Sequence, residues 1–341
     1  MQVPVPSQSN QPIVASIGQV ESLGADALLR NDLSDSYKAA ALRNQIDKVI
    51  AQNEAQGVSV TGVNVFDMQT NRMLVQRNES SVQFAASVNK LPIAWLILQD
   101  LRANKITLND TVTWTAADVR AGYGIYDQPG AATSATVQQL LHDMLNYSGN
   151  TAVRALVNGK LGGAAAVNTR LAAYPQIPNT RLQPLDANRF YVGNSTSKES
   201  LWVMEKLLAK SDKYQKVVKE ALQTNIFSYY GVRSQLEGNG FIVLANKVGI
   251  LDDVDGNNRH DVGIIYNTKT HKAYGYSFMT TTPYGNTAGT SQAEHSLDLM
   301  GRDTLRFAGD RPLKNKQISP FGIAPQAKSS ANAGVETKVL Y

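Results

Sequence analysis

Apolar residues at helical and at alternating spacing predict the elements at the start of the chain. Residues 36–53 carry apolar residues three and four positions apart, which predicts a helix. Residues 58–66 and 73–76 alternate apolar and polar side chains and predict two strands joined by a turn at 67–72. Gly62 lies where the alternation shifts by one residue, which predicts a β-bulge there.

The middle of the chain, from residue 87 to about residue 225, has helical spacing almost throughout. Six segments have it: 87–103, 136–147, 150–158, 163–173, 198–210 and 213–223. Strand patterns return afterwards in three segments: 241–249, 262–266 and 274–278. The polar segment 251–258 predicts a hairpin loop, and 289–307 predicts a final helix.

This order predicts an α+β fold, with an antiparallel sheet flanked by terminal helices and an inserted all-helical subdomain. Strand–helix–strand alternation with a glycine-rich phosphate loop is absent from the sequence, which argues against a nucleotide-binding fold. The polar, proline-containing N-terminus reads as a lead-in or linker, and the C-terminus as a loosely held tail. The predicted division is a lead-in at 1–35, one catalytic domain at 36–310 and a tail at 311–341. Within the catalytic domain, residues 36–80 and 226–310 form an α/β part and residues 81–225 a helical part.

The composition is that of an ordinary globular protein, with 341 residues, 43% hydrophobic and 18% charged. The net charge of +5 is spread among 28 acidic residues without a basic run, so nucleic acid is not an expected partner. The chain has no cysteine, which excludes disulfides, thiolate metal sites and a cysteine nucleophile. The first thirty residues lack the pattern of a signal peptide, which fits either a cytoplasmic protein or removal of an upstream signal or anchor.

An apolar helix begins with two chemically active side chains in "SVNKLPIAWLILQ", residues 87–99. Ser87 and Lys90 are one helical turn apart, so their side chains can touch. A lysine whose pKa is lowered by burial or by another cation can remove the proton of a serine hydroxyl. Pro92 predicts a distorted first turn. The alternative interpretation is a helix cap with a lysine that reaches solvent.

Two further motifs follow in an order that favours a catalytic site. "YSGN" places Ser148 and Asn150 between two predicted helices, and "NKVGI" places Lys247 and Gly249 at the end of a strand. Similar patterns elsewhere do not fit suitable elements. These are the serine–lysine pair of residues 195–198, which reads as a helix capping box of Thr196 and Glu199, and the segments 160–162 and 330–332.

This constellation resembles the penicillin-recognising serine hydrolases, and most closely the class A β-lactamase family, over roughly residues 36–309. The order of helices and strands is also similar to that of the family. "TRL" at 180–182 and the helix that begins near residue 197 bracket the place of the family's omega loop, and "GII" at 263–265 resembles a family strand.

The resemblance implies a role for each matching residue. Ser87 would be the acylated nucleophile, and Lys90 would help to activate it. Ser148 would relay a proton to the leaving nitrogen, and Lys247 would tune that relay and attract a substrate carboxylate.

The resemblance also implies the groups that bind the substrate. Asn150 would hold the substrate amide, and Gly249 would let the strand approach it closely. The backbone N–H groups of Ser87 and Ile250 would form the oxyanion hole. No cofactor and no metal is implied.

The first departure from the family follows Lys247. The family has a hydroxyl residue there, whereas Val248 cannot form a hydrogen bond to a carboxylate. The lost bond would weaken binding of an anionic substrate by roughly 1–3 kcal/mol. Arg233 or Arg259 could compensate, and the sequence does not decide between them.

The second departure concerns the glutamate of the omega loop, which activates water for deacylation in the family. The two possible alignments place Leu182 or Pro184 at that position, and neither is acidic. Asp186 is the nearby carboxylate and reads as a turn residue. The resemblance therefore implies acylation without the usual deacylation group.

The sequence thus predicts a serine hydrolase acylated at Ser87 by β-lactams or D-alanyl-D-alanine-type amides, with slow hydrolysis. The alternative is a penicillin-binding, sensor or DD-peptidase-like protein that keeps its acyl group. The family implies an extracytoplasmic location, β-lactam or cell-wall peptide partners, and membrane or wall association through upstream residues.

Other chemistries have weaker support in the sequence. The chain has four histidines, and none has the spacing of a zinc motif such as H-E-x-x-H. His142 lies within a predicted helix and His271 in a predicted turn, so a Ser-His-Asp triad is not expected.

Overall fold

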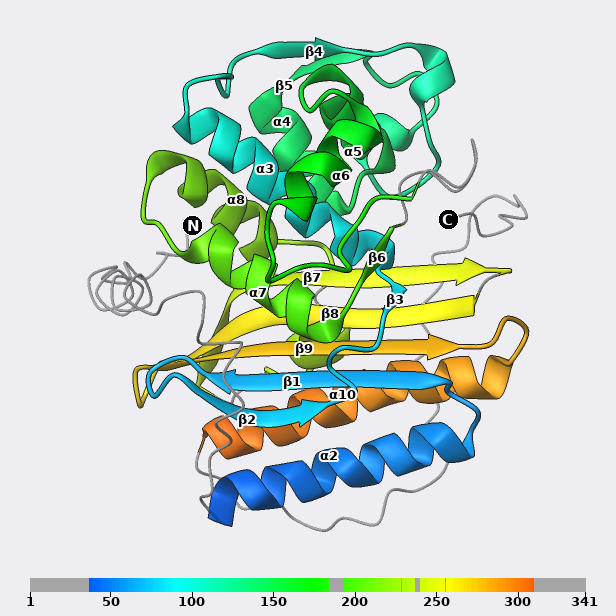
Figure 1. Ribbon diagram of the computed structural model, residues 1–341, viewed down its shortest axis with the longest axis vertical. Helices are drawn as coiled ribbons and strands as arrows, with labels where there is room; N and C mark the ends of the chain where they lie inside the picture. Colours follow the sequence, from blue (N-terminus) through cyan, green and yellow to red (C-terminus); the bar gives the residue numbers. More distant parts are fainter. Residues whose placement is uncertain (1–36, 184–192, 228, 237–239, 255, 310–341) are drawn as a thin grey trace, which may run out of the picture.

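A five-stranded antiparallel sheet forms the centre of the computed structural model, which describes residues 37–183, 193–227, 229–236, 240–254 and 256–309. The strand order is β2-β1-β9-β8-β7 (Figure 1). The strands are β1 Val60–Asp67, β2 Arg72–Arg77, β7 Phe241–Asp253, β8 Gly256–Asn267 and β9 Lys272–Thr282. The three C-terminal strands are joined as hairpins, and β1 inserts beside β9.

The terminal helices α2 (Tyr37–Ala55) and α10 (Thr287–Ala308) cover one face of the sheet (Figure 1). Their apolar residues at helical spacing, such as Leu42, Ile46 and Leu297, pack in one cluster with inward-facing strand residues. The opposite face packs against α7 and the helical subdomain in a second cluster. The central strands are buried on both faces, and they carry polar as well as apolar side chains, such as Asn258, His260 and Asp261 of β8.

The inserted subdomain is helical at the predicted positions. Its helices are α3 Lys90–Arg102, α4 Val137–His142, α5 Asn150–Gly159, α6 Gly163–Ala172, α7 Ser197–Leu208 and α8 Lys213–Gln223. The predicted helix at 136–147 changes to a π-helical turn, η5 (Asp143–Tyr147), before it ends. The predicted α+β fold with an inserted helical part is therefore confirmed. Among the helices that the structure describes, none combines the length and the apolar character of a membrane span.

Short strands, turns and one short helix that the apolar pattern did not predict complete the fold. They are the ladders β3 (Gln83–Phe84) with β6 (Asn194–Ser195) and β4 (Thr111–Thr113) with β5 (Ser134–Thr136), the 3₁₀ turns η2 (Ala86–Asn89), η3 (Ala116–Asp118) and η4 (Ile125–Asp127), and the short helix α9 (Gly231–Ser234). Elements of two to four residues contain too few side chains for a periodic pattern.

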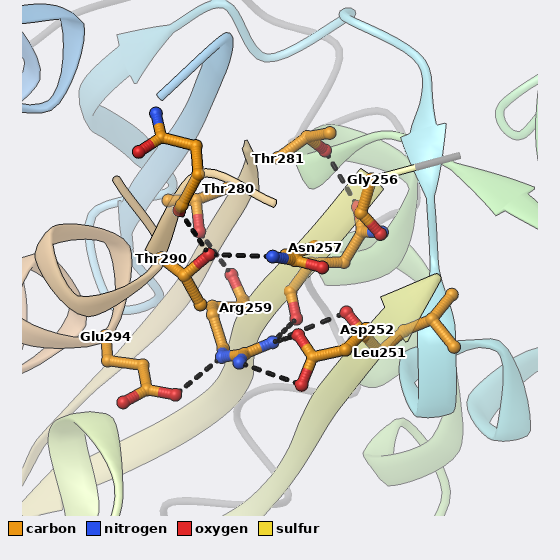
Figure 2. Close-up of polar contacts among 11 residues, drawn as sticks. Leu251, Asp252, Gly256, Asn257, Arg259, Thr280, Thr281, Thr290 and Glu294 are labelled. Atoms are coloured by element: carbon orange, nitrogen blue, oxygen red, sulfur yellow. Dashed lines mark hydrogen bonds and ion pairs between the residues drawn. The ribbon is translucent and has the colours of Figure 1, made fainter. Parts of the chain in front are cut away.

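The polar segment 251–258 contains a hairpin as predicted, but most of the predicted loop is strand. β7 continues to Asp253 and β8 begins at Gly256, with Asp252 opposite Asn257. Figure 2 shows the buried Arg259 between the carboxylates of Asp252 and Glu294, to which its nitrogens donate at 2.7 and 2.6 Å. Polar side chains that pair with each other extend the ladder as apolar ones would.

The predicted bulge at Gly62 is also wrong. Gly62 pairs in register with Met279, and the irregularity between β1 and β2 lies at Val65 and Phe66. A Cβ atom at Gly62 would lie 3.0 Å from the amide of Gln83 and 3.2 Å from the hydroxyl of Ser197. The glycine therefore serves close packing of neighbouring segments.

Helix α7 begins with half of the predicted capping box. The hydroxyl of Thr196 accepts a hydrogen bond from the N–H of Glu199 at 3.1 Å, as predicted. The Glu199 side chain does not return to Thr196. It accepts hydrogen bonds from the backbone and side chain of Asn179 and from the hydroxyl of Thr180. These bonds hold residues 179–180 against the start of α7.

Two buried glycines in adjacent strands provide a matched test of sheet packing. A Cβ at Gly263 would lie 2.5 Å from the Tyr276 hydroxyl and 2.6 Å from the Ala245 carbonyl oxygen, whereas a Cβ at Gly275 would meet the Leu201 side chain at 3.0 Å. Backbone cannot move as a side chain can, so Gly263→Ala should lower the free energy of unfolding by at least about 2 kcal/mol more than Gly275→Ala. Urea denaturation measures both, and equal losses would contradict this packing.

Candidate active site

Three distant parts of the chain meet at one group of polar side chains. Ser87 lies in the 3₁₀ turn η2, Lys90 is the first residue of α3, and Lys247 lies on the edge strand β7. Ser148 occupies the junction between η5 and α5. Pro92 is the third residue of α3, where its missing N–H breaks no helical hydrogen bond, so the irregular turn precedes the proline.

Hydrogen bonds join these side chains directly. The Nζ atom of Lys90 lies 2.8 Å from Oγ of Ser87 and 3.0 Å from Oγ of Ser148. On the other side, Nζ of Lys247 lies 3.0 Å from the same Ser148 oxygen. The Ser148 hydroxyl therefore lies between two amines, and one of them also contacts Ser87.

The four oxygens around Lys90 determine how its amine would be oriented in the neutral form. Besides the two hydroxyls, Nζ contacts the carbonyl oxygen of Ser148 at 2.8 Å and Oδ1 of Asn150 at 2.9 Å. These last two atoms can only accept, so they bind the two N–H groups of a neutral amine. The remaining lone pair then faces the hydroxyls of Ser87 and Ser148.

Burial changes the pKa of both lysines. Lys90 is 5% exposed, and burial lowers its pKa to about 8, against the opposing charges of Asp127 and Asp143. Lys247 is 1% exposed, and burial, followed by the charge of Lys90, lowers its pKa well below the ordinary value. The charge of Lys90 thus favours the neutral form of Lys247.

The backbone is strained at two residues of the site. Ser148 has a left-handed conformation, with φ of 61°, and Ala86, directly before Ser87, has φ of 46°. A non-glycine residue in this region costs on the order of 1 kcal/mol or more. At Ser148 the contacts with Lys90 compensate, because the carbonyl oxygen and the hydroxyl both bind the Lys90 amine.

Asn150 is the first residue of α5 and lies at the same group. Its Oδ1 contacts Lys90, and its Nδ2 donates to the carbonyl of Ala121 at 2.8 Å. The side chain of Asp127 accepts from the N–H groups of Asn150 and Thr151 at 3.0 and 2.8 Å. Asp127 therefore caps α5 from a separate turn and fixes the orientation of Asn150.

Gly249 lets β7 pass close to the turn that carries Ser87. A Cβ atom there would lie 3.1 Å from the Ala85 carbonyl oxygen and 3.1 Å from the Val88 side chain. Ser87 and Ile250 are both half-buried on either side of this approach. Their N–H groups as an oxyanion hole stay a prediction.

Val248 and the two arginines considered for carboxylate binding, Arg233 and Arg259, all contact other parts of the protein. Val248 is 3% exposed and packs with Phe227 and Tyr230 in the cluster on the α10 side of the sheet. Arg233 donates to Oδ1 of Asn246 at 2.8 Å and to the Leu222 carbonyl.

Arg259 likewise serves a structural pairing. It binds Asp252 and Glu294, as Figure 2 shows, and it also donates to the Leu251 carbonyl. Both arginines therefore already have protein acceptors, and a substrate carboxylate would have to compete with them.

The structure adds aromatic residues that the motifs did not identify. The ring of Phe227 lies 5.6 Å from Nζ of Lys247. Tyr123 packs edge-on against Phe227 with ring centres 5.7 Å apart, and Tyr229 lies 6.4 Å from Phe227. Tyr123 and Tyr229 are 66% and 68% exposed, so an aromatic surface reaches solvent beside the lysine. A single aromatic residue in a loop has no periodic signal in sequence.

The histidines take part in other contacts. His260 is fully buried, its Nε2 lies 2.7 Å from the Phe84 carbonyl, and burial lowers its pKa to about 4. His271 contacts the Tyr266 hydroxyl, and His142 packs against Tyr147. Within the described part of the chain, no cluster of three or more His, Asp or Glu residues could hold a metal ion.

The predicted omega-loop region is described only at its two ends. Leu182 is buried, and its N–H and carbonyl bind the side chain of Asn168. Pro184 and Asp186 lie outside the described residues, as do the lead-in at 1–35 and the tail at 311–341.

Comparison with solved structures shows the fold. A beta-lactamase from Sphaerobacter thermophilus superposes with a TM-score of 0.65 at 20% identity, covering 79% of this chain and 98% of that one. A beta lactamase from Burkholderia vietnamiensis gives 0.65 at 18% identity, covering 81% and 97%. PBP-A gives 0.64 at 17% identity, covering 75% and 94%.

Sequence comparison shows the family. No curated protein matches the chain significantly. The model of the beta-lactamase enzyme family matches residues 41–306, which is most of the chain and includes the three motifs of the site. The chain therefore belongs to the beta-lactamase enzyme family.

Proposed function

We propose that this protein is a serine hydrolase that is acylated at Ser87 by β-lactams or D-alanyl-D-alanine-type amides. The observation that carries the proposal is the contact of one buried lysine amine with both serine hydroxyls, at 2.8 and 3.0 Å. A related solved structure, a mutant of PBP-A, is described as an acyl-enzyme complex with penicillin G, which supports this reaction class.

Acylation would begin at the Ser87 hydroxyl. The neutral Lys90 amine accepts the proton as Oγ of Ser87 forms a bond to the substrate carbonyl carbon. The carbonyl oxygen then carries the negative charge, which the N–H groups of Ser87 and Ile250 would stabilise. The C–N bond breaks next, and the leaving nitrogen needs a proton.

Ser148 is the proposed route for that proton. Its hydroxyl contacts both Lys90 and Lys247, so it can donate its own proton to the leaving nitrogen and recover one from an ammonium group. Asn150 would bind the substrate amide beside this relay. Val248 and the engaged arginines predict weak recognition of a substrate carboxylate.

Hydrolysis of the acyl group is proposed to be slow. The two alignments of the omega-loop motif place no acidic residue at the position that activates water in the family, and Asp186 is the nearest candidate in sequence. The second candidate function is therefore a penicillin-binding or sensor protein, or a DD-peptidase-like protein, that keeps a stable acyl adduct. Either function implies a cell-wall peptide or β-lactam partner and an extracytoplasmic location.

Covalent labelling tests the nucleophile. Incubation with benzylpenicillin should add the mass of one penicillin molecule to the intact protein. Ser87→Ala should slow this labelling by at least about 10³-fold, because the attacking oxygen is lost. Ser134→Ala, on an exposed short strand, is the matched control and should label normally. Labelling of Ser87→Ala at the rate of the control would refute the assignment.

The pH dependence of labelling tests the base. Lys90 must be neutral to accept a proton, and its pKa is lowered to about 8, so labelling should slow as the pH falls below this value and level off above it. Lys90→Gln should lose most activity at every pH. Lys198→Gln, in the second serine–lysine pair, should leave the profile unchanged. Stopped-flow measurement from pH 5 to 9 decides this, and a flat profile would exclude Lys90 as the base.

Persistence of the adduct tests deacylation. After excess benzylpenicillin is removed, the intact mass should retain the acyl group for much longer than the adduct took to form. The physical reason is that no positioned carboxylate is expected to activate the hydrolytic water. Loss of the adduct as fast as it forms would show an efficient β-lactamase and would contradict slow turnover.

A further inference from the structure

A pair of carboxyl groups lies directly beneath the turn that carries Ser148. Asp143, the first residue of η5, and Asp127, the last residue of η4, approach each other from separate elements. A Cβ atom at Gly124 would lie 2.7 Å from Oδ2 of Asp143 and 2.8 Å from Oδ2 of Asp127. The two facing oxygens are therefore within less than about 6 Å of each other.

The two carboxyl groups differ in their hydrogen bonds. Asp127 accepts from the N–H groups of Gly124, Asn150 and Thr151, which use both of its oxygens. Asp143 is fully buried, and its Oδ1 accepts from the N–H of Ile125 at 2.6 Å. Its Oδ2 is buried without a hydrogen-bond partner. Asp127 therefore has an evident structural role as a helix cap, whereas one oxygen of Asp143 has none.

The unpartnered oxygen lies against Gly149, in the turn whose Ser148 carbonyl contacts the Lys90 amine. Gly149 follows Ser148, whose carbonyl contacts Nζ of Lys90 at 2.8 Å. A Cβ atom at Gly149 would overlap Oδ2 of Asp143, although the backbone there, with φ of −58°, would accept any residue. Glycine at this position thus makes room for the Asp143 carboxyl group immediately below the Ser148 carbonyl.

We propose that Asp143 is a positioning residue of the acylation reaction, whose carboxyl group beneath the Ser148–Asn150 turn controls the charge on Lys90. This inference rests on the proposed role of Lys90 as the base. An ionised Asp143 stabilises the ammonium form of Lys90 and so opposes activation of Ser87. A protonated Asp143 removes that charge and releases the neutral amine.

The charges around Asp143 are consistent with this coupling. The Asp143 pKa is raised to about 6, mainly because the carboxyl group is buried. The charge of Asp127 also raises this pKa, whereas the charge of Lys90 lowers it. Tyr126 also faces Asp143, and burial raises its pKa, so it remains neutral. Lys247 lies beyond Ser148, and the charge of Lys90 contributes to lowering the Lys247 pKa. Asp143 and Lys90 therefore change charge at neighbouring pH values.

Coupled titration has a distinctive kinetic signature. As the pH rises through about 6, Asp143 loses its proton and the pKa of Lys90 increases, so the neutral fraction of Lys90 rises less than tenfold per pH unit. The labelling rate of the wild-type protein should flatten between about pH 6 and 7 and steepen again before its plateau. An uncoupled base would give one steady tenfold rise per unit.

Asp143→Asn tests the coupling because asparagine keeps the acceptor for the Ile125 N–H and resembles the protonated acid. Losing a charge that favours the ammonium form lowers the Lys90 pKa, so labelling by benzylpenicillin at pH 7 should become roughly two- to fivefold faster. The flattened region should disappear. The control is Asp118→Asn, which removes a carboxylate of the same subdomain that pairs with Arg154, and should keep the wild-type profile.

A second measurement does not depend on a variant or on catalysis. The ¹³Cε resonance of Lys90 in the wild-type protein should titrate in two steps, one of them near pH 6. A single step, or a profile of Asp143→Asn that superimposes on the wild type, would overturn the inference. Absence of labelling at every pH would instead refute the proposed function, and the resonance of Lys90 would still decide the coupling.

Discussion

The whole site depends on burial of the Lys90 amine among oxygens that cannot neutralise it. Lys90 is buried, and its Nζ is bound by two hydroxyls and two carbonyl-type oxygens of Ser87, Ser148 and Asn150. An ammonium group in such surroundings loses hydration without gaining a direct ion pair, so its pKa falls to about 8. The turn of Ser87, the junction at Ser148 and the start of α5 at Asn150 each bring at least one oxygen to Nζ of Lys90.

The fold meets this requirement by joining its two layers at the edge of the sheet. Strand β7 supplies Lys247, and the helical subdomain supplies the two serines, so the reactive group lies where the layers meet. Gly249 lets the strand approach the turn of Ser87, and Gly149 leaves room for Asp143. The strained backbone at Ser148 is stabilised in the same contacts, since its carbonyl and its hydroxyl both bind Lys90.

The sequence predicted the parts of this arrangement that have a local signal. Helices of ten or more residues and the long strands have a period, and the motifs of Ser87, Ser148 and Lys247 have a fixed order on suitable elements. Asp127 and Asp143 were missed because what matters is their approach from separate turns, which no spacing encodes. The strand structure of most of 251–258 was missed because cross-strand pairing of Arg259 with Asp252 replaces the apolar alternation that marks a strand.

The side chains proposed to attack a carbonyl are in direct contact, whereas the side chains considered for binding a carboxylate are not available for it. Nζ of Lys90 lies within 3.0 Å of the hydroxyls of Ser87 and Ser148, whereas Val248 packs in the core and the two candidate arginines bind protein acceptors. Lys247 itself faces the ring of Phe227, with Tyr123 and Tyr229 exposed beyond it. An aromatic wall favours an apolar group of a substrate through area rather than charge. If the proposed function holds, the acyl side of the substrate would therefore contribute more to its binding than the carboxylate side.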